Sequence, residues 1–354
     1  MGPEPVDSCE HLKYHIGTGG LRREKRPLPG IVPRHMKKIR FISYMMRVKC
    51  EMDNRSIFAV DIGGSKLLAG IVKSDGSAHD LVRKELPPDI TTDALEQIIL
   101  DIWDRVRTDN GSAPSACGIT IPGVADAVSG TWVYACFSGI SNYPIVSRLQ
   151  SRLGIPVYIE NDANACAWAE KVFGLCRDCD DYMWITVSNG VGGGLVLNGK
   201  LYRGFCEGAG EFGHLIIEPD GRLCPCGHVG CMEAMAAGPG IAYRYEKLTG
   251  RAAAAMEIAQ RARDGEAAAL QVMQDTGSYI GRGLGKAACL INVRRYVLGG
   301  GVMQSFDLME EAIRTAFVQE AFARPNREVE IIQTGLGYEA ALLGAAAIAL
   351  RPVL

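Results

Sequence analysis

The chain has 354 residues, which is long enough for two domains of ordinary size and a substantial hydrophobic core. With 47% hydrophobic and 22% charged residues, it is neither a disordered chain nor a collagen-like or coiled-coil protein. The net charge of −2 gives the whole chain no bias toward nucleic acids or membrane surfaces.

The N-terminal segment, residues 1–54, differs from the rest. Its first 50 residues hold 11 basic and 4 acidic side chains and show no clear periodicity. We expect either a flexible extension or a sequence that begins upstream of the true first residue of the protein. An arm that binds nucleic acid is the alternative. The segment has no apolar signal core, and no apolar run in the chain reaches the ~20 residues of a spanning helix, so we expect a cytoplasmic protein.

The first half of the chain alternates between strand and helix patterns. A strand pattern at 56–64 passes through glycines into a second one, which an Asp75-Gly76 turn closes. Residues 91–108 carry apolar side chains at helical spacing. The other elements expected here are strands at 116–123 and 156–162 and helices at 145–153 and 163–174.

The second half repeats the opening pattern. We expect a strand at 181–190, a glycine turn at 191–194, and a strand closed by the hairpin pair Asn198-Gly199. Helices over about 233–290, a strand at 294–302, a helix at 307–322, a strand at 328–333 and a helix at 338–350 follow. The alternation predicts an α/β protein, and the two related halves predict a cleft between them.

Three glycine-rich segments next to strands are candidate phosphate-binding loops. They read Asp61-Ile-Gly-Gly-Ser-Lys66, Ser188-Asn-Gly-Val-Gly-Gly-Gly194 and Leu298-Gly-Gly-Gly-Val302. Their backbone N–H groups can approach a phosphate closely, and Asp61 can hold a hydrated magnesium ion. Neither the P-loop nor the dinucleotide fingerprint fits them. Ordinary turns are the alternative, but three clusters in one chain favour one nucleotide gripped from several sides.

The motif Glu160-Asn-Asp-Ala-Asn-Ala165 lies where a predicted strand meets a predicted helix. Ligands of open α/β sheets bind at these strand ends, so Asp162 is a candidate general base. Its alternative role is the helix N-cap, a favoured use of Asp. The motif alone does not choose between the two.

Three cysteines and a histidine predict a structural zinc site. Cys224, Cys226 and Cys231, with His214, would complete a closed tetrahedral shell. His228 is the rival fourth ligand, but its place between Cys226 and Cys231 would crowd the ion. Such a site would place Glu211 and Glu233 rigidly, and carboxylates of this kind accept hydrogen bonds from sugar hydroxyls.

Together these residues resemble the ROK family of sugar kinases and sugar-responsive regulators. The matches follow the family's order over about residues 55–350: Asp61-Ile-Gly-Gly-Ser-Lys66, Glu160-Asn-Asp-Ala-Asn-Ala165, Val191-Gly-Gly-Gly194, Glu211-Phe-Gly-His214, Cys224 to Glu233, and Leu298-Gly-Gly-Gly301. The resemblance implies a ribonuclease-H-like, actin- and hexokinase-like fold with an interdomain cleft. The domains would be residues 55–172 plus 338–354, and residues 173–337 with the zinc loop.

The resemblance also implies roles for single residues. Asp162 would be the catalytic base, and the zinc ligand His214 would reach the sugar through its other ring nitrogen. The sugar-binding set would be Asn161, Asp162, Glu211, His214 and Glu233. The set that binds magnesium and ATP would be Asp61, Gly63, Gly64, Ser65, Lys66, Asn189, Gly190, Gly192, Gly299 and Gly300.

Two segments depart from the family's pattern. Ser188-Asn189-Gly190 stands where the family has Gly-Thr-Gly, which leaves the phosphoryl donor open. Residues 135–142 lack the family's usual sugar-contacting Asn, so Ser138 or Asn142 would have to substitute for it. The runs Ala167–Glu170 and Ile185–Ser188 are also similar to the family's N-acetylmannosamine kinases.

We therefore expect ATP-dependent phosphorylation of the primary hydroxyl of a hexose, in the simplest case by a glucokinase. The alternatives are a kinase for N-acetylmannosamine, fructose or allose, and a sugar-sensing regulator of the same family. The segment before the first glycine loop shows no helix-turn-helix pattern, which disfavours the regulator. The expected partners are the hexose, ATP, and further copies of the chain in a homodimer or homotetramer, with no nucleic acid and no membrane.

Overall fold

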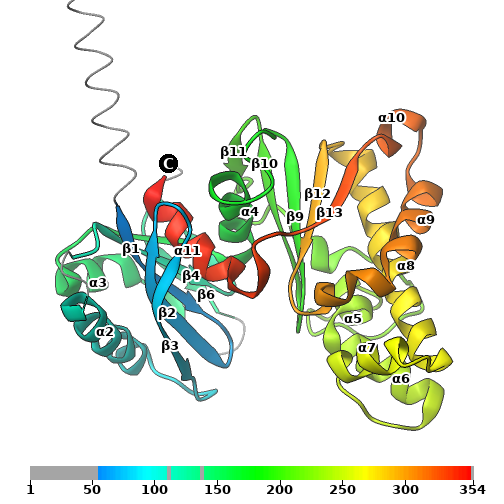
Figure 1. Cartoon of the computed structure of the whole chain (residues 1–354), viewed down its shortest axis with the longest axis horizontal. Coiled ribbons are helices and arrows are strands. Elements are labelled where there is room, and N and C mark those ends of the chain that lie inside the picture. The colour runs from blue at the N-terminus through cyan, green and yellow to red at the C-terminus, as the bar shows by residue number, and fades with distance from the viewer. Residues whose placement is uncertain (1–54, 110–112, 136–138, 352–354) are drawn as a thin grey trace, which may run out of the picture. The chain divides into compact units, whose positions relative to one another are not determined.

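The computed structural model describes residues 55–109, 113–135 and 139–351 (Figure 1). The described residues form two five-stranded mixed sheets and a small three-stranded sheet. The first sheet has the order β3-β2-β1-β4-β8: β1 (Ser56–Ile62), β2 (Lys66–Lys73), β3 (Ala78–Glu85), β4 (Ala116–Ile121) and β8 (Val157–Asn161). The second has the order β11-β10-β9-β12-β13: β9 (Tyr182–Val187), β10 (Val191–Leu197), β11 (Lys200–Tyr202), β12 (Arg295–Gly299) and β13 (Glu330–Gln333).

The two large sheets share one topology. In the first, β1 pairs antiparallel with β2 and parallel with β4; in the second, β9 pairs antiparallel with β10 and parallel with β12. The outer strands repeat the relation, because β3 and β11 extend the hairpins and β8 and β13 add parallel edges. The sequence repeat of strand, glycine turn and strand is therefore part of a duplicated sheet.

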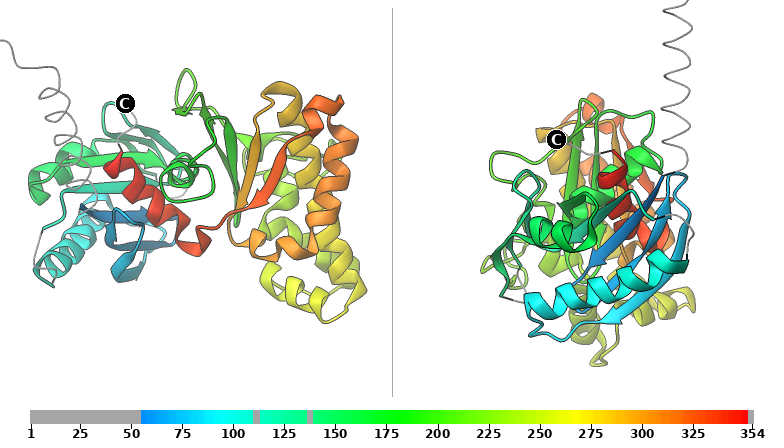
Figure 2. Two further views of the ribbon diagram at one scale, coloured as in Figure 1. Left: turned by 45° about the horizontal axis from the view of Figure 1, so that its top comes forward. Right: turned by 90° about the vertical axis from the view of Figure 1, so that its left-hand side faces the viewer.

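The helices cover the sheets on defined faces. They are α2 (Thr92–Asp109), α3 (Ile145–Leu153), α4 (Asp162–Val172), α5 (Met232–Ala236), α6 (Gly238–Thr249), α7 (Ala255–Arg263), α8 (Ala267–Leu290), α9 (Glu310–Glu320), α10 (Arg324–Arg327) and α11 (Ala340–Leu350). Three 3₁₀ turns add to them: η1 (Phe212–His214), η2 (Val302–Leu308) and η3 (Gly337–Glu339). Apolar residues of β9 pack against α8 and α9 on one face of the second sheet, while α4 covers the other face (Figure 2).

The last helix, α11, packs on the first sheet (Figure 1). It is apolar all round, as expected for a buried helix, and ten of its eleven residues are buried. Gly118 of β4 allows this close packing, because a Cβ there would lie 1.7 Å from the carbonyl oxygen of Ala345. Gly344 plays the same part where α11 meets Ala165 of α4.

One buried carboxylate, Glu170 of α4, contacts both segments through which the chain passes between the large sheets. Its Oε2 accepts a hydrogen bond of 2.7 Å from the backbone N–H of Leu175, just after α4. Its Oε1 accepts one of 2.5 Å from the hydroxyl of Thr334, which follows β13. Burial raises the pKa of Glu170, while these two donors lower it.

Three sequence-based expectations need correction. Residues 191–194 are not a turn but the start of β10. The helix expected at 307–322 is divided, because η2 ends at Leu308 and α9 begins at Glu310. The small sheet of β5 (Val124–Asp126), β6 (Thr131–Tyr134) and β7 (Ser141–Tyr143) was not anticipated, since its strands are too short to show periodicity.

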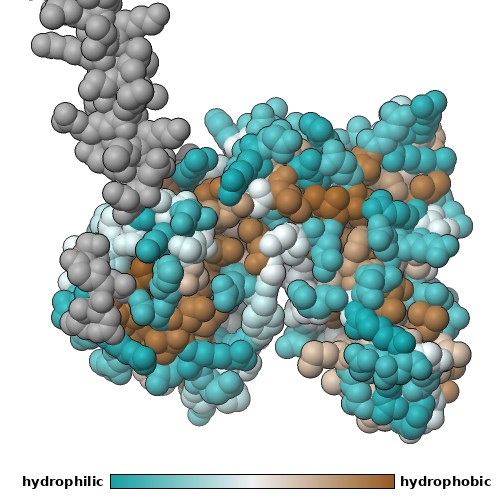
Figure 3. All heavy atoms as spheres, in the orientation of Figure 1, coloured by the Kyte–Doolittle hydropathy of each residue, from teal (hydrophilic) through white to brown (hydrophobic). Residues whose placement is uncertain are grey.

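The surface in Figure 3 is a mixture of hydrophilic residues and separate apolar patches. Among the described residues, no helix is both long enough and apolar enough to cross a membrane. The N-terminal extension of residues 1–54, with its predicted flexibility, lies outside the described residues.

Candidate active site and metal centre

The first functional element is the junction of β8 and α4. Asn161 caps α4: its side-chain Oδ1 accepts hydrogen bonds from the backbone N–H groups of Ala163 (2.9 Å) and Asn164 (3.1 Å). Its Nδ2 donates to the carbonyl of Gly123 at 2.9 Å. The cap is therefore Asn161 and not Asp162, the alternative raised from the motif. Asp162 is the first helical residue, and its carboxylate keeps acceptor capacity for a ligand.

Asp162 lies in an environment that disfavours its charge. Burial raises its pKa to about 6, and the negative charge of Asp61 adds to the rise. Asp61, near the end of β1, also has a raised pKa, mainly because of burial. Thr120 of β4 opposes that shift, since its hydroxyl donates a 2.9 Å hydrogen bond to Asp61 Oδ1. The negative charge of Asp61, from β1, therefore contributes to the raised pKa of Asp162, which follows β8 in the same sheet.

The first glycine loop joins β1 to β2. The N–H of Gly63 donates to the carbonyl of Lys66 at 2.8 Å, which closes the turn. Neither Gly63 nor Gly64 has a positive φ, so the backbone conformation does not require glycine here. Without a side chain, these residues instead leave room for a ligand to approach the backbone closely. The Lys66 ammonium hydrogen-bonds the Tyr338 hydroxyl and lies 4.9 Å from the centre of that ring.

The second and third glycine clusters meet at the end of β9. Ser188, Asn189 and Gly190 form the β9–β10 turn, in which the Ser188 N–H donates to the Gly190 carbonyl at 2.8 Å. In the third cluster Gly300 has a φ of +94°, and a Cβ on Gly301 would lie 3.5 Å from Ser188 Oγ. The two clusters are therefore adjacent, as one shared nucleotide would require.

Gly192 and Gly194 have a different use from Gly190. They lie within β10, and a Cβ on Gly194 would come within 2.6 Å of the carbonyl oxygen of Ala163. A Cβ on Gly192 would lie 3.3 Å from the Ala163 Cβ. Glycine here lets α4 approach the sheet closely, which is a packing function that the sequence pattern did not reveal.

The candidate metal centre consists of His214, Cys224, Cys226 and Cys231. One ligand atom from each lies within 4.8 Å of the other three. Cys226 Sγ is 3.6 Å from Cys231 Sγ, and Cys224 Sγ is 3.9 Å from His214 Nδ1. A tetrahedral ion with metal–sulfur bonds of about 2.3 Å separates its ligands by about 3.7 Å, so the donor set and its spacing fit zinc.

His228 is next to this cluster but outside the four-residue set. Its ring Nδ1 lies 3.5 Å from Cys226 Sγ. The backbone N–H and ring of His228 lower the pKa of Cys226 to about 6, which favours the thiolate that a metal needs.

Glu211 and Glu233 each lie next to one residue of this cluster. Glu211 is exposed, and its Oε2 is 3.9 Å from His214 Nε2, the ring nitrogen opposite the cysteines. Glu233 of α5 accepts a 3.0 Å hydrogen bond from the backbone N–H of Val191, and its other oxygen lies 4.0 Å from Cys224 Sγ. Glu233 therefore connects the cysteine loop with the second glycine turn.

The site includes two further residues that the sequence reasoning did not identify. Thr120 was hidden within an apolar strand pattern, although its hydroxyl contacts Asp61. Gly238 begins α6, and its N–H donates to the Ser188 carbonyl at 2.8 Å. No local signal in the sequence identified either one. Of the proposed substitutes for the missing Asn, Asn142 is exposed in β7, and Ser138 lies outside the described residues.

Comparison with known proteins adds a family context. A model of the ROK family matches residues 57–351. The chain is 32% identical over 312 residues to a glucokinase of Streptomyces coelicolor, covering 83% of this chain and 97% of that protein. It is 33% identical over 295 residues to an N-acetylmannosamine kinase of Salmonella typhi, covering 82% of this chain and 97% of that protein.

Solved structures have the same fold. A ROK family glucokinase from Streptomyces griseus, in complex with glucose and AMPPNP, superposes with a TM-score of 0.72 at 29% identity. The match covers 83% of this chain and 98% of that one. The predicted α/β, actin- and hexokinase-like fold class is thereby confirmed.

Proposed function

The chain belongs to the ROK family, and we propose that it is a kinase that transfers a phosphoryl group from ATP to the primary hydroxyl of a hexose. The observation that carries this proposal is Asp162. Its carboxylate stands where a sheet strand meets a helix, with a pKa raised to about 6; one oxygen accepts a 2.8 Å hydrogen bond from the N–H of Ala163, and acceptor capacity remains for a ligand. A base with such a pKa is largely ionised at neutral pH and still able to accept a proton.

In this mechanism Asp162 accepts the proton of the sugar hydroxyl as its oxygen attacks the γ-phosphorus. Asn161, Glu211 and His214 Nε2 would offer contacts to the other sugar hydroxyls. Glu233 would contribute its second oxygen. General base catalysis of this kind typically contributes about 10²–10⁴-fold to the rate.

The glycine loops would bind the nucleotide. Gly63, Gly64, Ser65 and Lys66 would face the phosphates from one side, and Asn189, Gly190, Gly299 and Gly300 from the other. Asp61, held by Thr120, would hold the magnesium ion, which neutralises phosphate charge when bound. Gly192, by its packing against Ala163, would support this loop without touching the ligand.

Zinc would have a structural role. His214, Cys224, Cys226 and Cys231 would hold it in a closed shell, which leaves no position for a reacting water. The ion would keep His214 oriented with Nε2 toward Glu211. We propose two domains, residues 55–172 plus 338–354 and residues 173–337. The packing of α11 on the first sheet supports the assignment of the C-terminal segment to the first domain. A homodimer or homotetramer stays a prediction.

Glucose and N-acetylmannosamine are the leading substrates. The glucokinase and N-acetylmannosamine kinase relatives are about equally similar to this chain, at 32% and 33% identity. Fructose, allose and a sugar-sensing regulator are the remaining alternatives.

The decisive experiment couples ADP formation to a spectrophotometric readout over a panel of hexoses and N-acetylhexosamines. We expect the wild-type protein to turn over one of them, and Asp162→Asn to lose about 10²–10⁴-fold in kcat while its affinity for the sugar changes little. Asp101→Asn, which changes an exposed acid on α2, is the matched control and should keep full activity. A folded, zinc-loaded wild-type protein without turnover on any sugar would refute the kinase, and an active Asp162→Asn would refute the base.

A further inference from the structure

Glu160 is a buried acid with no part in the mechanism above. It is 1% exposed and directly precedes Asn161 and Asp162 in the chain. Its Oε1 accepts hydrogen bonds from the N–H of Asn161 (3.0 Å) and from Asn164 Nδ2 (3.3 Å). The carboxylate is thus bonded to the helix cap and to the first turn of the helix that carries the base.

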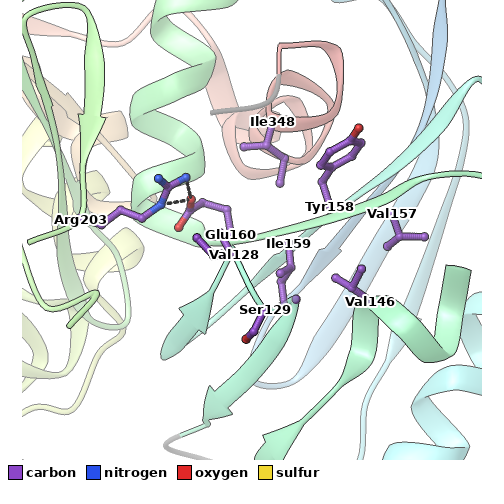
Figure 4. Close-up of a pocket in the computed structure, with 11 residues that line it drawn as sticks. Val128, Ser129, Val146, Val157, Tyr158, Ile159, Glu160, Arg203 and Ile348 are labelled. Carbon is purple, nitrogen blue, oxygen red and sulfur yellow. Dashed lines mark hydrogen bonds and ion pairs between the residues drawn. The ribbon is translucent and has the colours of Figure 1, made fainter. Parts of the chain in front are cut away.

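The partner of the other oxygen comes from the second half of the chain. Arg203, just after β11, approaches Glu160 Oε2 with Nε at 2.8 Å and Nη2 at 2.7 Å (Figure 4). Both side chains are largely shielded from water, with 15% of the Arg203 side chain and 1% of the Glu160 side chain exposed. Two opposite charges attract each other more strongly when they are shielded from water than on the surface. The loss of one partner leaves the other as an unpaired buried charge.

Arg203 also forms the base of the loop that leads to the proposed sugar-binding residues. Its carbonyl accepts a 3.0 Å hydrogen bond from the N–H of Ala209, and its Nε lies 3.6 Å from Glu207 Oε2. The chain then passes Gly210, where the backbone lies so close to β10 that a Cβ would be 2.4 Å from the Gly193 carbonyl oxygen. Glu211 and the metal-centre residue His214 follow immediately.

Packing alone does not hold the Arg203 side chain. The ion pair borders a cavity of about 200 Å³, whose other walls include Val128, Ser129, Tyr158 and Ile348 (Figure 4). Because there is open space beside the guanidinium, the contacts of Arg203 with Glu160 help to fix its position, together with its contact with Glu207.

On the basis of the proposed function, we propose that Arg203 is a positioning residue: its ion pair with Glu160 fixes the segment Gly210–His214 relative to the strand that ends beside Asp162. The pair sets the distance between the residues that bind the sugar and the base that deprotonates it. Neither residue touches the substrate. We expect the loss of this link to leave the phosphate loops at Gly63 and Gly190 unchanged.

The test compares four variants by steady-state kinetics and by amide hydrogen exchange. We expect Arg203→Met to raise the KM for the sugar and lower kcat/KM by up to about 100-fold, with the KM for ATP unchanged. Arg203→Lys keeps the charge but not the two-pronged contact and should be intermediate. Arg263→Met removes a surface ion pair with Asp307 of the same length, 2.7 Å, and should behave as wild type.

The double variant Glu160→Gln plus Arg203→Met separates positioning from charge balance. It removes the buried charge of Glu160 together with that of its partner, so we expect it to regain most of the Tm that Arg203→Met loses while its KM for the sugar stays high. Recovery of both would overturn the proposal, because Arg203 would then only neutralise Glu160.

The exchange measurement does not depend on kinase activity. Arg203→Met and the double variant should both speed amide exchange over residues 204–214 relative to wild type and Arg263→Met. Unchanged exchange in that segment would overturn the positioning role even if the protein is a kinase. Faster exchange in a protein without turnover on any sugar would support the link and refute only the proposed function.

Discussion

At the residue scale, we expect the ionisation of Asp162 to affect both activity and stability. Its carboxyl group must be ionised to accept a proton, and burial together with Asp61 raises its pKa to about 6. We therefore expect kcat/KM to rise with pH through about 6 and to level off above it. The pH profile of the coupled assay, with the coupling enzymes in excess at each pH, tests this. A limb centred near pH 4 would show that the site does not perturb the base.

The same shift predicts an effect on folding. Because the folded-state pKa of Asp162 lies above its ordinary value of 3.8, the contribution of this group to stability is present below about pH 4 and is lost as pH rises through 6. Asp162→Asn removes the buried charge. It should stabilise the protein at pH 8 by on the order of 3 kcal/mol, and far less at pH 4.

Urea unfolding of wild type and Asp162→Asn at both pH values measures this difference. Lower stability of the variant at pH 8 would mean that the site stabilises the carboxylate instead.

Substitutions within the four-residue cluster and at the neighbouring His228 should have opposite effects on bound zinc. Cys226→Ser removes a ligand of the four-residue cluster, so we expect loss of bound zinc and weaker sugar binding through His214. His228→Ala removes only a neighbour of Cys226 and should retain about one zinc per chain. Metal analysis of the purified proteins distinguishes them, and zinc loss in His228→Ala with retention in His214→Ala would exchange the two assignments.

At the element scale, glycines determine how closely α4 and α11 approach the sheets. Gly118→Ala would place a Cβ 1.7 Å from the backbone oxygen of Ala345, and a helix backbone cannot yield as a side chain does. We expect a loss of roughly 2–3 kcal/mol or more in the free energy of unfolding.

Gly208→Ala is the control for this substitution. Its Cβ would meet nothing closer than 4.0 Å, at a backbone conformation without positive φ. Denaturant unfolding should show this variant within a few tenths of a kcal/mol of wild type. Equal stability of the two variants would mean that α11 is not docked on β4.

At the scale of the whole molecule, residues 1–51 are expected to be dispensable. The family match begins at residue 57, so the segment lies outside the part of the chain shared with the relatives. Removal of residues 1–51 should leave kcat, the KM values and the Tm unchanged. A large loss of activity or stability in the truncated protein would show that the segment belongs to the fold.

Much of the fold was predictable from local signals in the sequence. The α/β class, the glycine hairpin of each half and the final buried helix followed from periodicity and turn residues, because these are local signals. The cysteine spacing likewise predicted a metal site, and the structure brings the four expected side chains together. Element boundaries were wrong where glycines serve packing, as in Gly192–Gly194 of β10.

By itself, the sequence determined the fold class, the chemistry of the candidate ligands and their order along the chain. Only the tertiary structure decided that Asn161 is the helix cap, that Thr120 contacts Asp61, and that Arg203 pairs with Glu160. For the last two the physical reason is separation: the contacts join residues 59 and 43 positions apart, and no local pattern encodes a partner on another strand. For the cap, Asn and Asp are both favoured residues, so the motif alone does not choose between Asn161 and Asp162. A cap, an apolar-strand threonine and a loop arginine acquire their roles only when the sheets form.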